Sequence, residues 1–402
     1  IKLTRDAELD IDSDLSKSIT EKISKSLKQR KIGEPVRLVY DSQIPKDMLD
    51  FLTKSMKIDK NQALLPGGRY HNFKDFMQFP KVGGNELINT SLPTLEHPKL
   101  KGNKSMFEVL KKGDILLTFP YQSFDHIIDF LREAAIDPAV TSIKITLYRA
   151  ARNSKIINAL VNALQNGKSV TAVVELQARF DEQANLNLAN KLQDEGATLI
   201  YGVQGLKVHS KIIYISRKEG TKTVAYAHVG TGNFNESTAK VYSDFSLFTQ
   251  DSRVTSEVEK VFHFFKNNYK AGTYKHLLVA PFYMRNKILK LIQNEIKNAK
   301  AKKPALIQLK LNSLTDEELI KKLYAASHAG VKIQLIIRGI CSLVPGVKGM
   351  SENIEAISLV DTYLEHARSM LFHNNGNELV YISSADWMIR NLDFRTEVAC
   401  PI

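Results

Sequence analysis

Two histidines, His209 and His366, are each followed at the second position by a basic residue, Lys211 or Arg368. A neutral imidazole is nucleophilic near pH 7, so a histidine accepts a phosphoryl group with little activation and can pass it on. A lone histidine in a sequence is more often a structural residue. Two histidines at comparable positions, each close to a cation, point instead to phosphoryl transfer.

Four arginines support phosphate chemistry. They are Arg149, Arg179, Arg338 and Arg395. Ligands of open α/β sheets bind beyond the carboxyl ends of strands, and the first three arginines follow predicted strands. A guanidinium offers a planar fork to phosphate oxygens and stays charged when it is desolvated. Any one of the four is suited to a surface ion pair, but the set predicts a cleft that holds a polyphosphate and stabilises charge during phosphoryl transfer.

Three further side chains are candidates for the same site. Tyr242 is suited to bonding a phosphate or stacking on a base, and a half-buried strand tyrosine is an equally good interpretation. Asp244 and Glu397 occupy equivalent positions in the two copies of a repeat. We therefore expect each of them to orient a histidine through a hydrogen bond to a ring nitrogen. On this hypothesis, replacing Asp244 with Asn slows phosphorylation of His209.

Both histidines lie in segments of the chain that repeat each other. In each copy a strand-like run is followed by a helix, a second strand, the histidine and a further strand. The runs before the histidine are residues 142–149, 156–165 and 169–175 in the first copy and 305–312, 318–328 and 331–337 in the second. When Arg149 is laid on Asn312, the spacing to the next shared glycine, Gly167 or Gly330, is 18 positions in both copies. The sequence therefore predicts two domains related by duplication.

The chain is expected to contain three regions, since 402 residues suffice for two or three domains. Residues 1–96 form a first region of mixed helices and strands, and the two copies occupy residues 97–275 and 276–402. The predicted fold class is α/β, with an α+β first region and two tandem α/β domains. Ile1 lies inside a predicted strand and Ile402 just after another, so we expect the chain to be part of a longer protein.

Composition limits the partners and the compartment. The formal net charge of +13 favours an anionic partner but does not choose between nucleic acid, phosphate chains and anionic lipid. The sequence lacks basic motifs interleaved with aromatic residues, so no nucleic acid is expected. We find no signal peptide and no apolar run long enough to span a bilayer. Cys341 and Cys400 have no metal-ligand partners nearby and are interpreted as reduced cytoplasmic thiols.

The paired histidine motifs resemble the phospholipase D superfamily, which joins two His-x-Lys motifs at a pseudo-twofold interface. Residues 230–233, Gly-Thr-Gly-Asn, are similar to its Gly-Ser-x-Asn element. The sequence departs from that pattern where an aspartate is expected seven residues after each histidine, because Ser216 and His373 stand there. Arg368 also replaces an expected lysine. A phosphodiesterase of the phospholipase D type is therefore an alternative that these departures argue against.

A closer resemblance is to the bacterial polyphosphate kinases of the first type. Sequence blocks that carry it extend across essentially the whole chain. They are residues 4–10 (TRDAELD), 66–73 (PGGRYHNF), 145–149 (ITLYR), 173–185 (VVELQARFDEQAN), 205–211 (GLKVHSK), 228–237 (HVGTGNFNES), 337–343 (IRGICSL) and 363–366 (YLEH). The resemblance implies reversible transfer of the γ-phosphoryl group of ATP to inorganic polyphosphate through a phosphohistidine, with ATP or ADP and Mg²⁺ as cofactors.

The resemblance also implies roles for the two histidines. His209 matches the phosphohistidine nucleophile of the family. His366 matches its second histidine, which contacts the nucleotide and assists transfer as an acid or as a phosphate-binding group.

The remaining candidates match binding positions of the family. Tyr242 and Arg338 match nucleotide contacts, and Arg395 matches a phosphate contact. Arg149 and Arg179 match positions of the Mg²⁺–phosphate site. Because a guanidinium has no lone pair to offer a metal, we interpret that contact as one made through phosphate oxygens or water.

The family organisation implies an identity for each region. Residues 1–96 match part of a head domain, residues 97–275 the first phospholipase D-like catalytic domain, and residues 276–402 the second, which is incomplete at its C-terminus. The family forms homodimers or higher homo-oligomers, is cytoplasmic, and associates with the periphery of the inner membrane. A protein that only binds polyanions stays a second alternative. Salt-dependent binding that survives loss of His209 without turnover would favour it.

Overall fold

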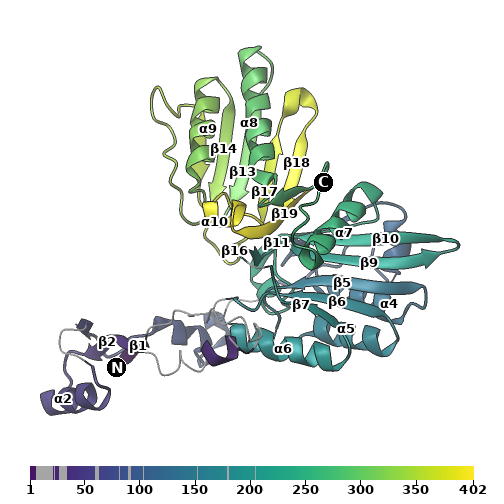
Figure 1. The fold of residues 1–402 in the computed structure, drawn as a ribbon. Helices are drawn as coiled ribbons and strands as arrows, with labels where there is room; N and C mark the ends of the chain where they lie inside the picture. Colours follow the sequence, from purple (N-terminus) through teal and green to yellow (C-terminus); the bar gives the residue numbers. More distant parts are fainter. Residues whose placement is uncertain are drawn as a thin grey trace. The chain divides into compact units, whose positions relative to one another are not determined.

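The structure, a computed structural model, describes residues 1–5, 21, 23–26, 34–58, 63–80, 82–88, 92–102, 104–151, 153–178, 181–203 and 205–402 (Figure 1). Internal contacts divide the chain into two compact units, Ile1–Leu92 and Pro93–Ile402, and each is described by itself. No helix in the described ranges is long and apolar enough to cross a membrane. Arg179, one of the four predicted phosphate ligands, lies outside the described residues.

The first unit is built on a three-stranded sheet. Strand β1 (Lys2–Arg5) pairs antiparallel with β2 (Pro35–Asp41), which pairs parallel with β3 (Ala63–Gly67). Helix α2 (Lys46–Ser55) makes the crossover that two parallel strands require. Two short 3₁₀ segments follow, η1 (Phe73–Gln78) and η2 (Asn85–Leu87).

The second unit contains two eight-stranded sheets of the same strand order (Figure 1). The first sheet runs β16-β11-β10-β9-β5-β6-β7, with β4 also beside β11; the second runs β12-β19-β18-β17-β13-β14-β15, with β8 also beside β19. In the first half the strands are β4 (Ile115–Phe119), β5 (Val140–Leu147), β6 (Ser169–Val174), β7 (Thr198–Ile200), β8 (Lys207–Val208), β9 (Lys211–Glu219), β10 (Lys222–Gly230) and β11 (Tyr242–Thr249). In the second half they are β12 (Leu278–Ala280), β13 (Leu306–Leu311), β14 (Lys332–Ile337), β15 (Ile354–Ile357), β16 (Leu364–Glu365), β17 (Arg368–Phe372), β18 (Leu379–Ser383) and β19 (Arg395–Pro401). The predicted α/β fold is confirmed.

Helices cover the sheets and connect their parallel strands. They are α3 (Met106–Leu110), α4 (Asp125–Ile136), α5 (Lys155–Gln165), α6 (Glu182–Asp194), α7 (Ser252–Lys266), α8 (Met284–Lys300), α9 (Glu317–His328) and α10 (Ile389–Leu392), with 3₁₀ segments η3 (Thr238–Lys240) and η4 (Asn374–Gly376). The helices predicted over 156–165 and 318–328 are confirmed as α5 and α9. Side-chain oxygens start both: Ser154 accepts from the Ile156 N–H and Asp316 from the Leu319 N–H.

A shared hydrophobic core joins the two halves of the second unit. Val258, Phe262 and Phe265 of α7 pack in one cluster with Leu247 of β11 and Val398 of β19. A second core lies between α8, α9 and the strands of the second sheet. Because α7 buries apolar surface against both halves, the edges formed by β11 and β19 are held in one body.

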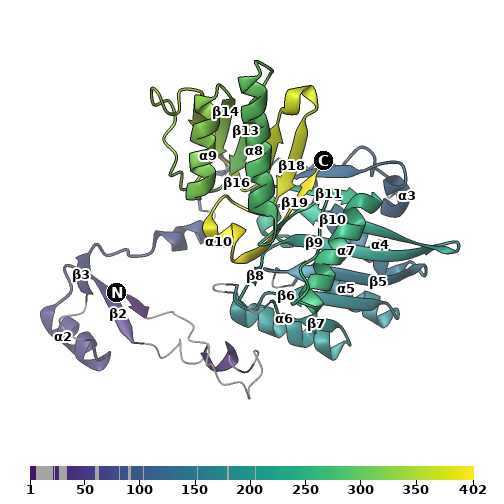
Figure 2. The same cartoon turned by 45° about the horizontal axis from the view of Figure 1, so that its top comes forward.

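Each half contributes a short strand to the sheet of the other half. Strand β8 of the first half pairs parallel with β19 of the second, through Lys207 opposite Arg395 and Val208 opposite Thr396. Strand β16 of the second half pairs parallel with β11 of the first. Both strands lie where the two sheets meet (Figure 2). His209 follows β8 directly and His366 follows β16 directly, so the exchange places each of these two histidines beside the sheet of the opposite half.

The strand pairing corrects the predicted alignment of the two copies by one residue. The register of β5 with β9 and of β13 with β17 makes Ile145 the counterpart of Leu309. Tyr148, rather than Arg149, is therefore the counterpart of Asn312. The equal spacing of 18 positions was misleading because the connections from strand to helix differ in length, and surface loops absorb such differences without disturbing strand register.

Candidate active site

His209 is fixed by the short strand that precedes it. Its backbone N–H donates to the Thr396 carbonyl at 3.0 Å, and the preceding Val208 N–H donates to Glu175 Oε2 at 2.8 Å. The Tyr148 ring meets the imidazole edge-on, with ring centroids 5.1 Å apart. The side chain of His209 is 11 % exposed. The imidazole is thus clamped from both halves of the unit, with one edge open.

A buried carboxylate orients the His209 ring. His209 Nδ1 lies 2.8 Å from Glu397 Oε1 and 2.9 Å from Oε2. Glu397 also accepts hydrogen bonds from Asn391 Nδ2 at 2.7 Å and from Ser384 Oγ at 2.5 Å. A carboxylate that accepts from three donors assigns the ring hydrogen to Nδ1. No hydrogen bond from a described residue reaches His209 Nε2, so its lone pair is available for attack on phosphorus.

The charge environment keeps His209 neutral. Burial, together with the positive charges of Lys211 and Arg395, holds the pKa of His209 well below its ordinary value. The unprotonated imidazole is the nucleophilic form, so the residue is ready to react at neutral pH.

His366 is oriented in the same way by a carboxylate from the other half. Its Nδ1 lies 2.9 Å from Asp244 Oδ1 and 3.0 Å from Oδ2, and Thr231 Oγ1 donates to Oδ1 at 2.6 Å. Arg368 Nη1 lies 3.1 Å from His366 Nε2 and 3.4 Å from Nδ1, so the guanidinium contacts the face of this ring.

The carboxylates prove to be crossed between the halves. Asp244 orients His366, and Glu397 orients His209. The hydrogen bonds agree with the expectation that each carboxylate orients a histidine. Asp244 bonds His366, however, and not His209, whose phosphorylation the predicted Asp244→Asn test would follow. The exchange of β8 and β16 is the physical reason. Strand β8 brings His209 to β19, which carries Glu397, and β16 brings His366 to β11, which carries Asp244.

The basic residue after each histidine points back into the site. Lys211 is 2 % exposed, and its Nζ donates to the His209 carbonyl. Burial lowers the pKa of Lys211 to about 7. Arg368 donates to the His366 carbonyl at 2.9 Å and pairs through two nitrogens with Asp386, at 3.1 and 3.3 Å.

Two of the predicted arginines, Arg395 and Arg338, act electrostatically on groups at the two histidines. Arg395 belongs to β19, and its charge acts on both His209 and Lys211. Arg338 follows β14, and its Nε donates to Asn312 Oδ1. Arg149 follows β5 and forms an ion pair with Asp181 at 2.7 Å, in which each side chain is 41 % exposed.

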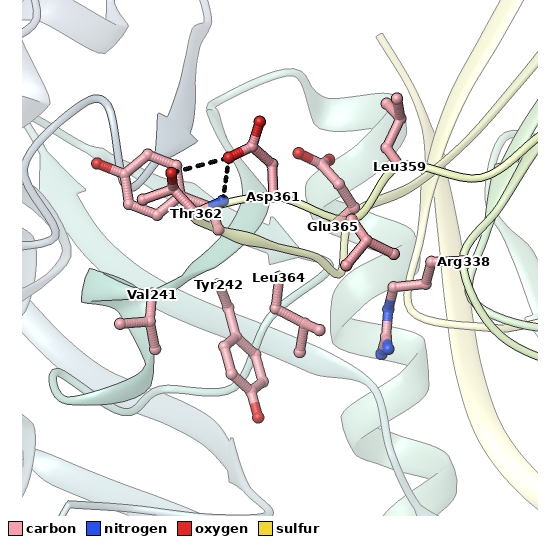
Figure 3. A pocket seen from close by; sticks show the side chains of 10 residues that line it. Val241, Tyr242, Arg338, Leu359, Asp361, Thr362, Leu364 and Glu365 are labelled. Atoms are coloured by element: carbon pink, nitrogen blue, oxygen red, sulfur yellow. Dashed lines mark hydrogen bonds between the residues drawn. The ribbon is translucent and has the colours of Figure 1, made fainter. Parts of the chain in front are cut away.

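A cavity of about 420 Å³ opens between Tyr242, Arg338 and the segment that precedes His366 (Figure 3). Tyr242 and Arg338 line it together with the segment Leu359–Glu365. The Tyr242 and His366 rings are 5.2 Å apart between centroids. The structure therefore brings together three residues predicted to contact a nucleotide. A concave site with an aromatic ring and a guanidinium is suited to a base or sugar joined to phosphates.

Sequence reasoning missed several residues that shape the site. Tyr148 was missed because the predicted alignment matched Arg149 to Asn312, whereas the strand register matches Tyr148 to Asn312. Thr231 and Ser384 each bond the carboxylate that orients the opposite histidine, and their equal spacing to Asp244 and Glu397 was a usable signal. Nothing along the chain marked Asn391, since its contact with Glu397 depends on how α10 folds back against β19.

Comparisons with known proteins agree with this architecture. The family model of the polyphosphate kinase middle domain matches residues 1–79, that of C-terminal domain 1 matches residues 105–271, and that of C-terminal domain 2 matches residues 277–402. Among curated relatives, the polyphosphate kinase of Vibrio parahaemolyticus is 50 % identical over 402 residues, covering 100 % of this chain and 58 % of that protein. The polyphosphate kinase of Escherichia coli K12 is 48 % identical over 404 residues, covering 100 % of this chain and 59 % of that protein.

A solved structure is also similar. The crystal structure of polyphosphate kinase from Porphyromonas gingivalis superposes with a TM-score of 0.82 at 40 % identity, over 92 % of this chain and 56 % of that one. The chain spans somewhat more than half the length of these relatives. With three family models in order along the sequence, the chain belongs to the polyphosphate kinase family.

Proposed function

We propose that the chain carries the phosphoryl-transfer centre of a polyphosphate kinase, which moves the γ-phosphoryl group of ATP reversibly to the end of inorganic polyphosphate through a phosphohistidine at His209. One observation carries the proposal. His209 is held through Nδ1 by Glu397, while Nε2 receives no hydrogen bond from any described residue. The family and the relatives of similar sequence supply the reaction class.

The first step forms a bond from His209 Nε2 to the γ-phosphorus. The bond from that phosphorus to the β–γ bridging oxygen breaks, and ADP leaves with its electron pair. Because Nδ1 keeps its hydrogen, the phosphorylated ring carries a positive charge, which the Glu397 carboxylate balances. In the second step a terminal oxygen of polyphosphate attacks the same phosphorus, the P–N bond breaks, and neutral His209 is restored. Both steps run in reverse when ADP is the acceptor.

Cations around the transferred group stabilise its charge in this proposal. Lys211, Arg395 and Arg368 all act electrostatically on His209 and hold its pKa down along with burial. The same charges favour a phosphoryl group, and fixed charges in a desolvated site stabilise a transition state more than solvent does. We assign His366 to binding the phosphate, and it acts as an acid when it takes up a proton.

We assign the cavity lined by Tyr242 and Arg338 to the nucleotide, with Tyr242 against the base or sugar and Arg338 toward the phosphates. Mg²⁺ enters with the ATP phosphates as part of the substrate. The described residues do not fit a resident site made of protein ligands, because no group of three or more His, Cys, Asp or Glu side chains gathers there. Arg149 and Arg179 would meet Mg²⁺ only through phosphate oxygens or water.

Three family properties are proposals for the full-length protein. They are assembly into a homodimer or higher homo-oligomer, a cytoplasmic location, and association with the periphery of the inner membrane. The net charge of +13 supports contact with an anionic partner, which includes polyphosphate and anionic lipid. Size measurement by light scattering, and cosedimentation with vesicles of anionic lipid, test the first and last of these.

The proposal is tested by incubating the full-length protein and its His209→Ala variant with γ-labelled ATP and Mg²⁺. The expected result is an acid-labile, base-stable label on the wild type and none on the variant. Polymer synthesis by a wild type that carries no label in rapid-quench samples would contradict the covalent route. Neither label nor synthesis, with cleavage of bis(p-nitrophenyl) phosphate, would favour a phosphodiesterase. Polyphosphate binding without any turnover would favour a binding protein.

A further inference from the structure

Lys211 and Arg368, the cations that follow the two histidines, pair with equivalent positions of the neighbouring strand in the two sheets. Lys211 stands directly opposite Gly230 in the first sheet, and Arg368 stands directly opposite Ser383 in the second. Three residues beyond these partners the two halves differ, with an asparagine at 233 and an aspartate at 386. These two positions are therefore structural counterparts that carry different charges.

In the second half the cation is neutralised within its own half. Arg368 and Asp386 are 4 % and 6 % exposed and pair through two nitrogen–oxygen contacts. The backbone N–H groups of Asn312 and Ser313 donate to Asp386 Oδ1 at 2.7 and 3.2 Å. The guanidinium charge nearest His366 thus already has a counter-ion that is locked in place.

In the first half the corresponding charge has no such counter-ion. Lys211 makes no ion pair with a carboxylate among the described residues. Asn233 is neutral, and its side-chain oxygen is buried without a hydrogen-bond partner. Glu397 and Asp244 act on Lys211 from a distance, but each of them is already bonded to a histidine. A buried cation without its own anion is a favourable neighbour for an incoming phosphoryl group.

We infer that the difference between Asn233 and Asp386 decides which of the two histidines is phosphorylated. Asn233 leaves the charge of Lys211 for the phosphoryl group on His209. Asp386 takes up the charge of Arg368 and leaves a neutral pair beside His366. This inference rests on the proposed phosphohistidine route and names positioning residues that act through Lys211 and Arg368 to select the acceptor.

The experiment places a carboxylate at position 233 of the full-length protein. Asn233→Asp keeps the size of the side chain and supplies the missing counter-ion, so label from γ-labelled ATP on the peptide containing His209 should fall roughly tenfold or more, as expected for loss of one charge-assisted contact. Asn233→Ser, which is neutral, is the matched control and should retain most of the label. The new carboxylate can pair with Lys211, so the Tm of Asn233→Asp should not fall.

The reverse charge change gives a second, independent reading. The double variant Asn233→Asp, Asp386→Asn exchanges the two charges, and its label should move toward the peptide containing His366. Wild-type labelling of His209 in both Asn233→Asp and the double variant would overturn the inference. A fall of label and Tm together in Asn233→Ser as well would also overturn it, because the position would then matter for folding alone. Absence of label from the wild type would count against the proposed function instead.

Discussion

The residue that follows the second central parallel strand is a buried glutamate in the first half of the second unit and an arginine that lines a cavity in the second half. Glu175 follows β6, is buried, and accepts from the N–H groups of Val208 and Gln177, each at 2.8 Å. Its counterpart after β14 is Arg338, which lines the 420 Å³ cavity. At this position of the duplicated frame, the first half therefore braces β8 and the second half lines a cavity.

The two histidines differ in a complementary way. In the first half, Nε2 of His209 receives no hydrogen bond from a described residue, whereas in the second half the His366 ring has Arg368 Nη1 against its face. A nucleophile needs a free lone pair, and a binding site needs space and fixed donors. In the proposed function the two halves therefore have different roles, with the nucleophile in the first and the nucleotide in the second.

The largest effect is expected from breaking the crossed carboxylates. Glu397→Gln removes the negative charge and replaces one of the two acceptor oxygens with a donor, so the His209 tautomer is no longer fixed. The rate of label formation on His209 should fall about 10²-fold, the usual cost of a misplaced reacting group. Asp244→Asn, the matched change on the other side, should leave labelling of His209 far less affected and slow overall turnover. Rapid-quench labelling measures both. A larger loss of His209 label in Asp244→Asn would contradict the crossed assignment.

A smaller effect is expected from the counterparts Arg338 and Glu175. Arg338→Ala removes a charged donor worth about 1.5–3 kcal/mol, so KM for ATP should rise roughly 10- to 100-fold, with a smaller change in kcat. Glu175→Gln should lower Tm and leave KM for ATP nearly unchanged, because the side chain braces β8. Steady-state kinetics and thermal unfolding separate the two outcomes. Equal changes in KM would show that the halves do not differ in nucleotide binding.

The smallest expected effect is a shift in pH dependence. Burial lowers the pKa of Lys211 to about 7, so its charge is present below that pH and is lost above it. The pKa of His209 is also lowered, so the nucleophile stays neutral on the acid side of its ordinary value. The kcat/KM for ATP, which reports the free enzyme, should therefore decline as pH rises through about 7.

The variant Lys211→Arg tests whether Lys211 is the titrating group, because it introduces the residue type of Arg368, its counterpart in the second half. A guanidinium stays charged at all accessible pH values, so the decline above neutral pH should disappear. The pH profile of kcat/KM measures this directly. A profile in the variant that matches the wild type would show that Lys211 is not the group that titrates.

Many of the strands and helices could be predicted from the sequence, but the pairing of carboxylates with histidines in the site could not. Apolar strand runs, the helices α5 and α9, and the two histidines followed from periodicity and repeat spacing. The crossed pairing of Asp244 and Glu397 could not be predicted, because spacing along the chain is the same whichever histidine each carboxylate serves. The exchange of β8 and β16 between the sheets determines which histidine each carboxylate bonds. Tyr148 was missed for a related reason, since loops of unequal length shift the copies without changing strand register.

The proposed covalent route places the transferred phosphorus on one atom, Nε2 of His209. The most direct measurement traps the phosphorylated full-length protein at alkaline pH, maps the labelled peptide, and assigns the phosphorylated ring nitrogen by NMR with ¹⁵N-labelled histidine. We expect phosphorus on Nε2 of His209, while Nδ1 keeps its proton and donates it in a hydrogen bond to Glu397. Phosphorus on Nδ1, or on His366, would contradict it.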